Sequence, residues 1–124
     1  MKSIRTLLVA ALLAVPNAFA GDISGFWQHV DEPGWIEINL QEGRGTVVRN
    51  DKFPDRVGRE ILKDLKADDS GDGQWTGQVY AEKLGEYKDA KITLAKPDLM
   101  TIKVKVGFMS RTIEWRRVEA LPTN

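Results

Sequence analysis

The stretch Leu99-Met100-Thr101-Ile102-Lys103-Val104-Lys105-Val106 decides the fold class of this chain. Apolar side chains alternate in it with Thr and Lys, so every second residue points to the same face of an extended strand. A second segment, Trp35–Leu40, repeats the pattern, with one face made of Ile36, Ile38 and Leu40 and the other of Trp35, Glu37 and Asn39. Alternation of this kind predicts an antiparallel sheet with one face buried and one face in water.

Turn-forming residues recur along the chain on both sides of this stretch. Short segments rich in β-branched and aromatic residues lie between them. The predicted strands are Ile23–Val30, Trp35–Leu40, Thr46–Asn50, Ile61–Lys66, Gln74–Tyr80, Tyr87–Leu94, Leu99–Val106 and Thr112–Val118. Eight antiparallel strands can close into a barrel, and closure removes the sheet edges. We predict an all-β fold, a single eight-stranded antiparallel meander barrel. An open two-sheet sandwich is the alternative, and Val57–Leu65 is the one segment that could instead form one or two helical turns.

The N-terminal segment has the organisation of a secretory signal peptide. Lys2 and Arg5 precede the unbroken apolar run Leu7–Val15, and Ala18-Phe19-Ala20 offers small residues at the positions that signal peptidase reads. The run is shorter than the about 20 apolar residues that a membrane span needs. No cysteine follows it, which excludes a lipoprotein anchor. We predict cleavage after Ala20 and a periplasmic or secreted location.

Residues 21–124 are then a single domain with a modest core. They carry 16 Lys and Arg against 18 Asp and Glu, a net charge of −2, which gives no electrostatic basis for binding nucleic acid. The absence of cysteine excludes disulfides, thiol nucleophiles and zinc–thiolate sites. No second apolar segment exists, so we expect no stable membrane insertion after signal cleavage. The sequence does not predict an oligomeric state.

Several motifs spread over residues 21–124 point to one family. They are Gly25-Phe26-Trp27, Val57–Leu62, Trp75-Thr76-Gly77-Gln78-Val79-Tyr80, Tyr87 with Ala90, and Arg111-Thr112-Ile113-Glu114-Trp115-Arg116-Arg117-Val118. With these motifs the chain resembles the DUF2147 family of exported bacterial proteins, whose members have lipocalin-like barrels. The resemblance implies the fold and the exported compartment. It implies no activity, because the function of the family is unassigned.

The same resemblance implies a structural clasp made of Trp27 and Arg117. In lipocalin-like barrels a Trp on the first strand closes one end, and an Arg on the last strand lies across it. A guanidinium plane stacks well on an indole face, and its N–H groups can reach carbonyls at chain ends. Alternation places Arg117 on the same face as Trp115 and Ile113, pointing toward the closed end. An exposed Arg117 is the alternative.

Aromatic residues are the candidates for ligand binding. The chain has four tryptophans, and a barrel mouth lined by Trp35, Trp75 or Tyr87 could hold an apolar or aromatic ligand. Most aromatic residues of a small barrel serve as core, so a filled barrel is the alternative. The loop Asp51–Glu60 is either a lid over the open end or a solvated connection.

No set of residues predicts catalysis. His29 is the single histidine, and no nucleophile motif accompanies it, so we expect a solvated side chain at a strand end. The adjacent carboxylates Asp31/Glu32 and Asp68/Asp69 point apart and do not form a glycosidase pair. The loop Asp68–Gly73 resembles the first half of a calcium loop, but Val79 stands where a bidentate Glu is needed, so a plain turn is expected. We predict no enzyme activity, no metal and no cofactor.

The leading hypothesis for function is a non-enzymatic binding protein of the cell envelope. Its partner would be a small apolar or amphipathic ligand, held in or at the mouth of the barrel. The alternative is a structural or protein-interaction module of the envelope with a filled barrel. In that case an exposed Trp35 on the outer face of its strand would be the docking residue.

Overall fold

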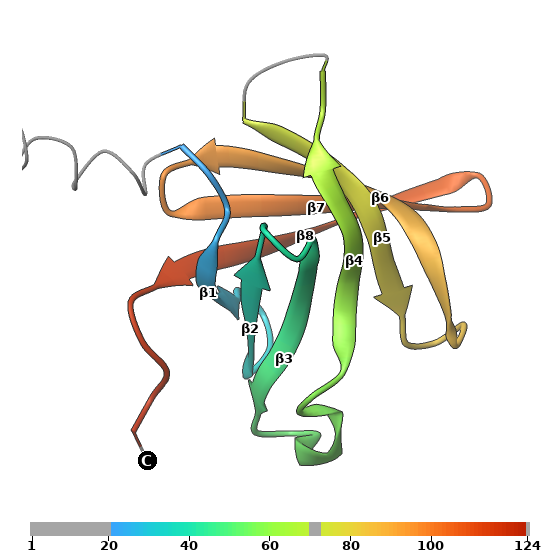
Figure 1. The fold of residues 1–124 in the computed structure, drawn as a ribbon. Coiled ribbons are helices and arrows are strands. Elements are labelled where there is room, and N and C mark those ends of the chain that lie inside the picture. Colours follow the sequence, from blue (N-terminus) through green and yellow to red (C-terminus); the bar gives the residue numbers. More distant parts are fainter. Residues whose placement is uncertain (1–20, 70–72, 124) are drawn as a thin grey trace, which may run out of the picture.

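The computed structural model describes residues 21–69 and 73–123, and the predicted signal peptide, residues 1–20, lies outside them. Eight strands pair antiparallel in chain order, and the last strand returns to the first to close a barrel (Figure 1). The strands are β1 (Gly25–His29), β2 (Gly34–Asn39), β3 (Arg44–Asn50), β4 (Glu60–Ala67), β5 (Gln74–Ala81), β6 (Glu86–Lys96), β7 (Leu99–Val106) and β8 (Met109–Val118). The predicted eight-stranded antiparallel barrel is confirmed, and the open sandwich is wrong.

The strand that decided the fold class is β7, with the predicted bounds. β8 begins at Met109 instead of the predicted Thr112, because Gly107 and Phe108 alone make the turn between the two strands. Gly107 has a φ of 65°, and a glycine at the first position of a two-residue hairpin turn suits the twist of the flanking strands. The ladder between β7 and β8 therefore continues to the pair formed by Val106 and Met109.

The long connection between β3 and β4 contains a short 3-10 helix, η1 (Pro54–Arg56). The segment 57–65, for which one or two helical turns were the alternative prediction, contains the end of this connection and the first residues of β4. The described part of the chain contains no helix with the length and apolar character needed to cross a bilayer.

Inward-facing side chains form one apolar core. On β7, Met100, Ile102 and Val104 are buried whereas Lys103 and Lys105 are exposed, as alternation requires. The buried core consists of Ile23, Trp27, Ile36, Ile38, Val47, Leu62, Leu65, Trp75, Val79, Ala90, Ile92, Met100, Ile102, Val104 and Trp115. Burying one large apolar side chain stabilises a fold by about 1.5–3 kcal/mol. This core is the main source of stability in a chain that has no cysteine.

β4 kinks where it crosses β5. The register between the two strands shifts between Lys63 and Lys66, and Asp64 has a φ of 55°. Gly77 on β5 lies against the kink, because a Cβ there would be 2.8 Å from Leu65 Cδ2 and 2.9 Å from the Lys63 carbonyl oxygen. Only glycine permits this approach of the two backbones. The kink brings Asp64 and Lys66 to the rim of a hollow on the outside of the barrel.

Candidate functional site

One end of the barrel is closed by Trp27 and Arg117, which pair directly across β1 and β8. The Arg117 guanidinium carbon lies 4.4 Å from the centre of the Trp27 ring. Its Nη1 donates to the Ser24 carbonyl at 2.9 Å, its Nη2 to the Asp22 carbonyl at 2.6 Å, and its Nε to the Pro97 carbonyl at 2.8 Å. Burial lowers the pKa of Arg117. One side chain thus ties the segment before β1 to the turn between β6 and β7.

Trp27 is fully buried and donates from Nε1 to the Ile23 carbonyl at 2.9 Å. Its indole therefore has a satisfied donor, an apolar contact with the core and a cation over one face. Such an arrangement is structural, since every polar group in it is already occupied.

Trp35 lies on the outer face of the sheet and is not part of the core cluster. Its cross-strand partners are Gln28 and Arg49, whereas its neighbour Ile36 pairs with the core residue Trp27. The Arg49 guanidinium carbon lies 5.2 Å from the centre of the Trp35 ring, and Trp35 is only 6% exposed. The hypothesis of an exposed docking Trp35 is therefore wrong, because the ring is covered.

Trp75 and Tyr87 lie on opposite faces of the barrel wall. Trp75 is buried in the core cluster opposite Ile92. Tyr87 pairs with Tyr80 on the outer face, and its hydroxyl donates to the Glu60 carbonyl at 2.6 Å. Burial raises the pKa of Tyr87, and the charge of Glu60 adds to the effect. None of Trp35, Trp75 and Tyr87 lines the hollow that contains Lys91 or the smaller hollow that contains Arg44.

His29 is half-buried, and it caps the turn that follows β1. Its Nδ1 accepts hydrogen bonds from the backbone N–H groups of Asp31 at 3.0 Å and Glu32 at 3.1 Å. The ring also meets Trp115 edge-on, with the ring centres 4.9 Å apart. With its acceptor nitrogen used in this way, His29 has a structural role in the turn rather than the solvated one expected.

Within residues 21–69 and 73–123, no three His, Asp or Glu side chains gather closely enough to hold a metal ion. Residues 70–72 of the loop Asp68–Gly73, the calcium-loop resemblance, lie outside the described residues.

The loop Asp51–Glu60 is tied to the turn between β5 and β6. Arg59 forms an ion pair with Glu82, and Arg56 lies 3.7 Å from the same carboxylate. At the start of the loop the Asn50 side chain accepts hydrogen bonds from the backbone N–H groups of Lys52 and Phe53. These contacts hold the loop along the wall of the barrel beside the β5–β6 turn.

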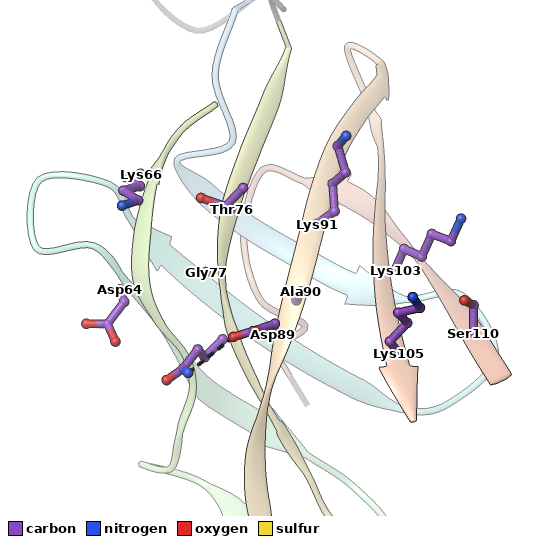
Figure 2. A pocket seen from close by; sticks show the side chains of 11 residues that line it. Asp64, Lys66, Thr76, Gly77, Asp89, Ala90, Lys91, Lys103, Lys105 and Ser110 are labelled. Atoms are coloured by element: carbon purple, nitrogen blue, oxygen red, sulfur yellow. Dashed lines mark hydrogen bonds between the residues drawn. The ribbon is translucent and has the colours of Figure 1, made fainter. Parts of the chain in front are cut away.

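A hollow of about 710 Å³ lies over the outward face of β4 to β8. We call it the outer groove. Its lining residues are Asp64, Lys66, Thr76, Gly77, Gln78, Asp89, Ala90, Lys91, Lys103, Lys105 and Ser110. Figure 2 shows Lys91, Lys103 and Lys105 on neighbouring strands, with Asp64 and Lys66 across from them on β4. Gly77 and Ala90, which pair directly, also line this hollow, although the side chain of Ala90 belongs to the core.

Positive charge dominates the outer groove, which has four lysines and two aspartates. Lys91 and Lys103 stand directly opposite each other on β6 and β7. Like charges in this position repel and destabilise a sheet. Lys91 has a distant carboxylate partner, Asp68, at 3.9 Å, and the described residues offer Lys103 no ion pair at all. The groove is therefore suited to an anionic group that bridges the two ammonium groups.

The strand pattern predicts that the polar face of each strand lies in water, and it does not predict the outer groove. A signal was present: Lys91, Lys103 and Lys105 all occupy outward positions on two consecutive strands. Lys91 and Lys103 become partners only through the register of β6 and β7, which the turn Pro97-Asp98 sets together with the register shift between Leu94 and Lys96.

A family model described as an uncharacterized protein conserved in bacteria (DUF2147) matches residues 25–117. No curated protein and no solved structure matches the chain.

Proposed function

The chain belongs to the DUF2147 family, and we propose that it is an exported, non-enzymatic binding protein of the cell envelope whose outer groove takes an amphipathic molecule with an anionic head group. The observation that carries this proposal is the pair Lys91 and Lys103, two cations held directly opposite each other over a hollow. An anion between them would remove their repulsion and gain two charge-assisted hydrogen bonds.

The chemistry of the walls supports an amphipathic ligand over a simple ion. The aliphatic stems of the lysines present apolar surface along the groove while their ammonium groups remain in water. Gln78 and Asp89, which hydrogen-bond to each other at 3.4 Å, and Thr76 add uncharged and acidic groups that can orient a head group carrying hydroxyls. An acidic segment of a protein partner is the alternative occupant of the same face, consistent with a filled barrel.

Export rests on the signal-like organisation of residues 1–20, and absence of catalysis rests on the lack of a nucleophile, base and metal set in the sequence. An apolar ligand inside the barrel has less support than one in the outer groove. The interior positions of the barrel are occupied by the core cluster, which includes Trp27, Trp75 and Trp115.

The test uses the full chain expressed with residues 1–20 and purified from the periplasmic fraction. Calorimetry measures binding of dihexanoyl phosphatidylglycerol, a soluble anionic amphiphile, with the phosphatidylcholine analogue as the zwitterionic control. We expect binding of the anionic probe alone. The double variant Lys91→Gln/Lys103→Gln should bind more weakly, by up to about thirty-fold, since each of the two exposed charge pairs that it removes contributes up to about 1 kcal/mol.

Lys96→Gln is the matched control, because Lys96 is an exposed lysine of β6 that does not line the outer groove. It should bind like the wild type. Equal binding of both probes, or a double variant that binds as tightly as Lys96→Gln, would refute the proposal. Capture of an acidic protein by the groove lysines without amphiphile binding would support the alternative occupant. Failure of the full chain to reach the periplasm would refute the exported role.

A further inference from the structure

The large apolar side chains that the described residues leave exposed all lie in three connections. Phe53 and Val57 belong to the β3–β4 connection, Leu84 to the β5–β6 turn, and Phe108 and Met109 to the β7–β8 hairpin. In a barrel whose strands alternate in direction, these three connections share one end. Figure 1 shows them along the lower and right side of the molecule, away from the turn between β6 and β7 that Arg117 contacts. We call this the loop end.

The β7–β8 hairpin is the most prominent part of the loop end. Phe108 is 104% exposed relative to the reference for its residue type, and Met109 is 69% exposed. No atom lies within 4 Å of the position that a Cβ on Gly107 would take, so the tip stands clear of the rest of the molecule. A fully exposed Phe contributes nothing to the folded state through burial, and clustered exposed apolar groups usually mark an interaction site.

The positive charge of the loop end is concentrated at the exposed tip. With the β1–β2 turn included, residues 30–33, 51–59, 82–85 and 105–111 contain six Lys and Arg against five Asp and Glu, a net charge of +1. Asp51 pairs with Arg49, and Glu82 pairs with Arg56 and Arg59, so these charges compensate one another. Lys105 and Arg111 flank the exposed tip, and the segment 103–111 has no acidic residue.

We propose that the loop end docks onto a lipid bilayer that contains anionic phospholipids, with Phe108 and Met109 entering the interfacial region. Lys105 and Arg111 then lie at the level of the phosphates, where basic residues beside a membrane are attracted to an anionic surface. The proposal does not rest on the function of the outer groove, because Phe108 and Met109 lie outside it and only Lys105 belongs to both surfaces.

The shape of the loop end favours a bilayer over a protein partner. Its apolar residues stand on three separate turns, and none of them lines the outer groove. A protein partner would need a complementary pocket for each turn. A fluid interface accommodates an isolated aromatic side chain without one, and Phe is among the residues found on the buried face of interfacial segments.

The experiment measures sedimentation of the exported protein, expressed as the full chain and purified from the periplasm, with vesicles of phosphatidylcholine that contain phosphatidylglycerol. We expect binding that falls as NaCl is added, and little binding to vesicles of phosphatidylcholine alone. The double variant Phe108→Ser/Met109→Ser should partition about ten-fold less, since burial of one large apolar side chain changes an equilibrium by about that factor or more. Its melting temperature should stay that of the wild type, because both side chains are exposed.

A second variant, Phe108→Trp, reports the depth of insertion. The four native tryptophans are each 7% exposed or less, so quenching of fluorescence by brominated lipid acyl chains should come from the new indole alone. The double variant Lys91→Gln/Lys103→Gln should keep at least half of the vesicle binding, and Phe108→Ser/Met109→Ser should keep binding of the soluble amphiphile, which separates the two proposals. Equal binding to both vesicle types, no quenching, or cross-linking of position 108 to a protein without vesicle binding would each overturn the docking proposal.

Discussion

Replacing Arg117 by Ala should open the closed end of the barrel and cost about 3 kcal/mol of unfolding free energy. The side chain makes two partly buried hydrogen bonds, to the carbonyls of Ser24 and Asp22. Each contributes about 1 kcal/mol net. Stacking over Trp27, at 4.4 Å, adds about 1 kcal/mol. The third bond, to the Pro97 carbonyl, is exposed and is counted as zero.

Urea unfolding followed by tryptophan fluorescence measures this loss, and a melting curve should show a decrease of roughly 10–20 °C for a domain of this size. Arg117→Lys keeps the charge but loses the planar fork, so we expect it to retain one bond and to lose about 2 kcal/mol. Arg116→Ala is the matched control, because Arg116 is the neighbouring residue on the same strand and its side chain is exposed. A loss of less than about 0.5 kcal/mol for Arg117→Ala, no larger than for an ordinary surface substitution, would refute the reasoning.

Two further predictions concern aromatic residues. Trp27→Phe should destabilise the fold by about 2 kcal/mol more than Trp115→Phe, because the first breaks the bond to the Ile23 carbonyl and the second removes a buried indole N–H that has no partner among the described residues. Equal losses in chemical denaturation would contradict this. Tyr87→Phe should cost about 1 kcal/mol near neutral pH, from the lost bond to Glu60. Burial raises the pKa of Tyr87 above its ordinary value of about 10, so its contribution is present below that pH and is lost as the pH rises through the raised pKa. The difference between wild type and variant should therefore shrink above about pH 10, and a constant difference up to about pH 11 would show that the phenol does not titrate with the fold.

The strands and their inward faces were predictable because each depends on residues close together in the chain. Alternation in Leu99–Val106 specifies which side chains lie inside, and Met100, Ile102 and Val104 are buried. The same alternation puts Tyr87 on the face opposite Ala90, although the aromatic residues taken alone suggested that Tyr87 lines a barrel mouth with Trp75. Alternation does not predict how far each residue lies from an end of the barrel, because that distance depends on the stagger between strands.

The candidate site was not predictable in the same way. Lys91 and Lys103 are separated in the chain by a turn, and they stand opposite each other only in one register of β6 and β7. A shift of one residue would move every side chain of a strand to the other face. The hollow beneath them is also lined by Asp64, and therefore depends on the kink of β4 that Gly77 accommodates.

The sequence by itself determined the fold class, the number of strands and the face that each strand buries, since a period of two follows from the backbone geometry of a strand. Only the tertiary structure decided which groups meet across the barrel. Closure brings β8 against β1, so that Arg117 finds the carbonyls of Asp22 and Ser24 far away in the chain. It also gathers lysines of different strands in the outer groove and exposed apolar turns at the loop end. These juxtapositions depend on register and stagger, which the whole ring of strands fixes together and no single segment specifies.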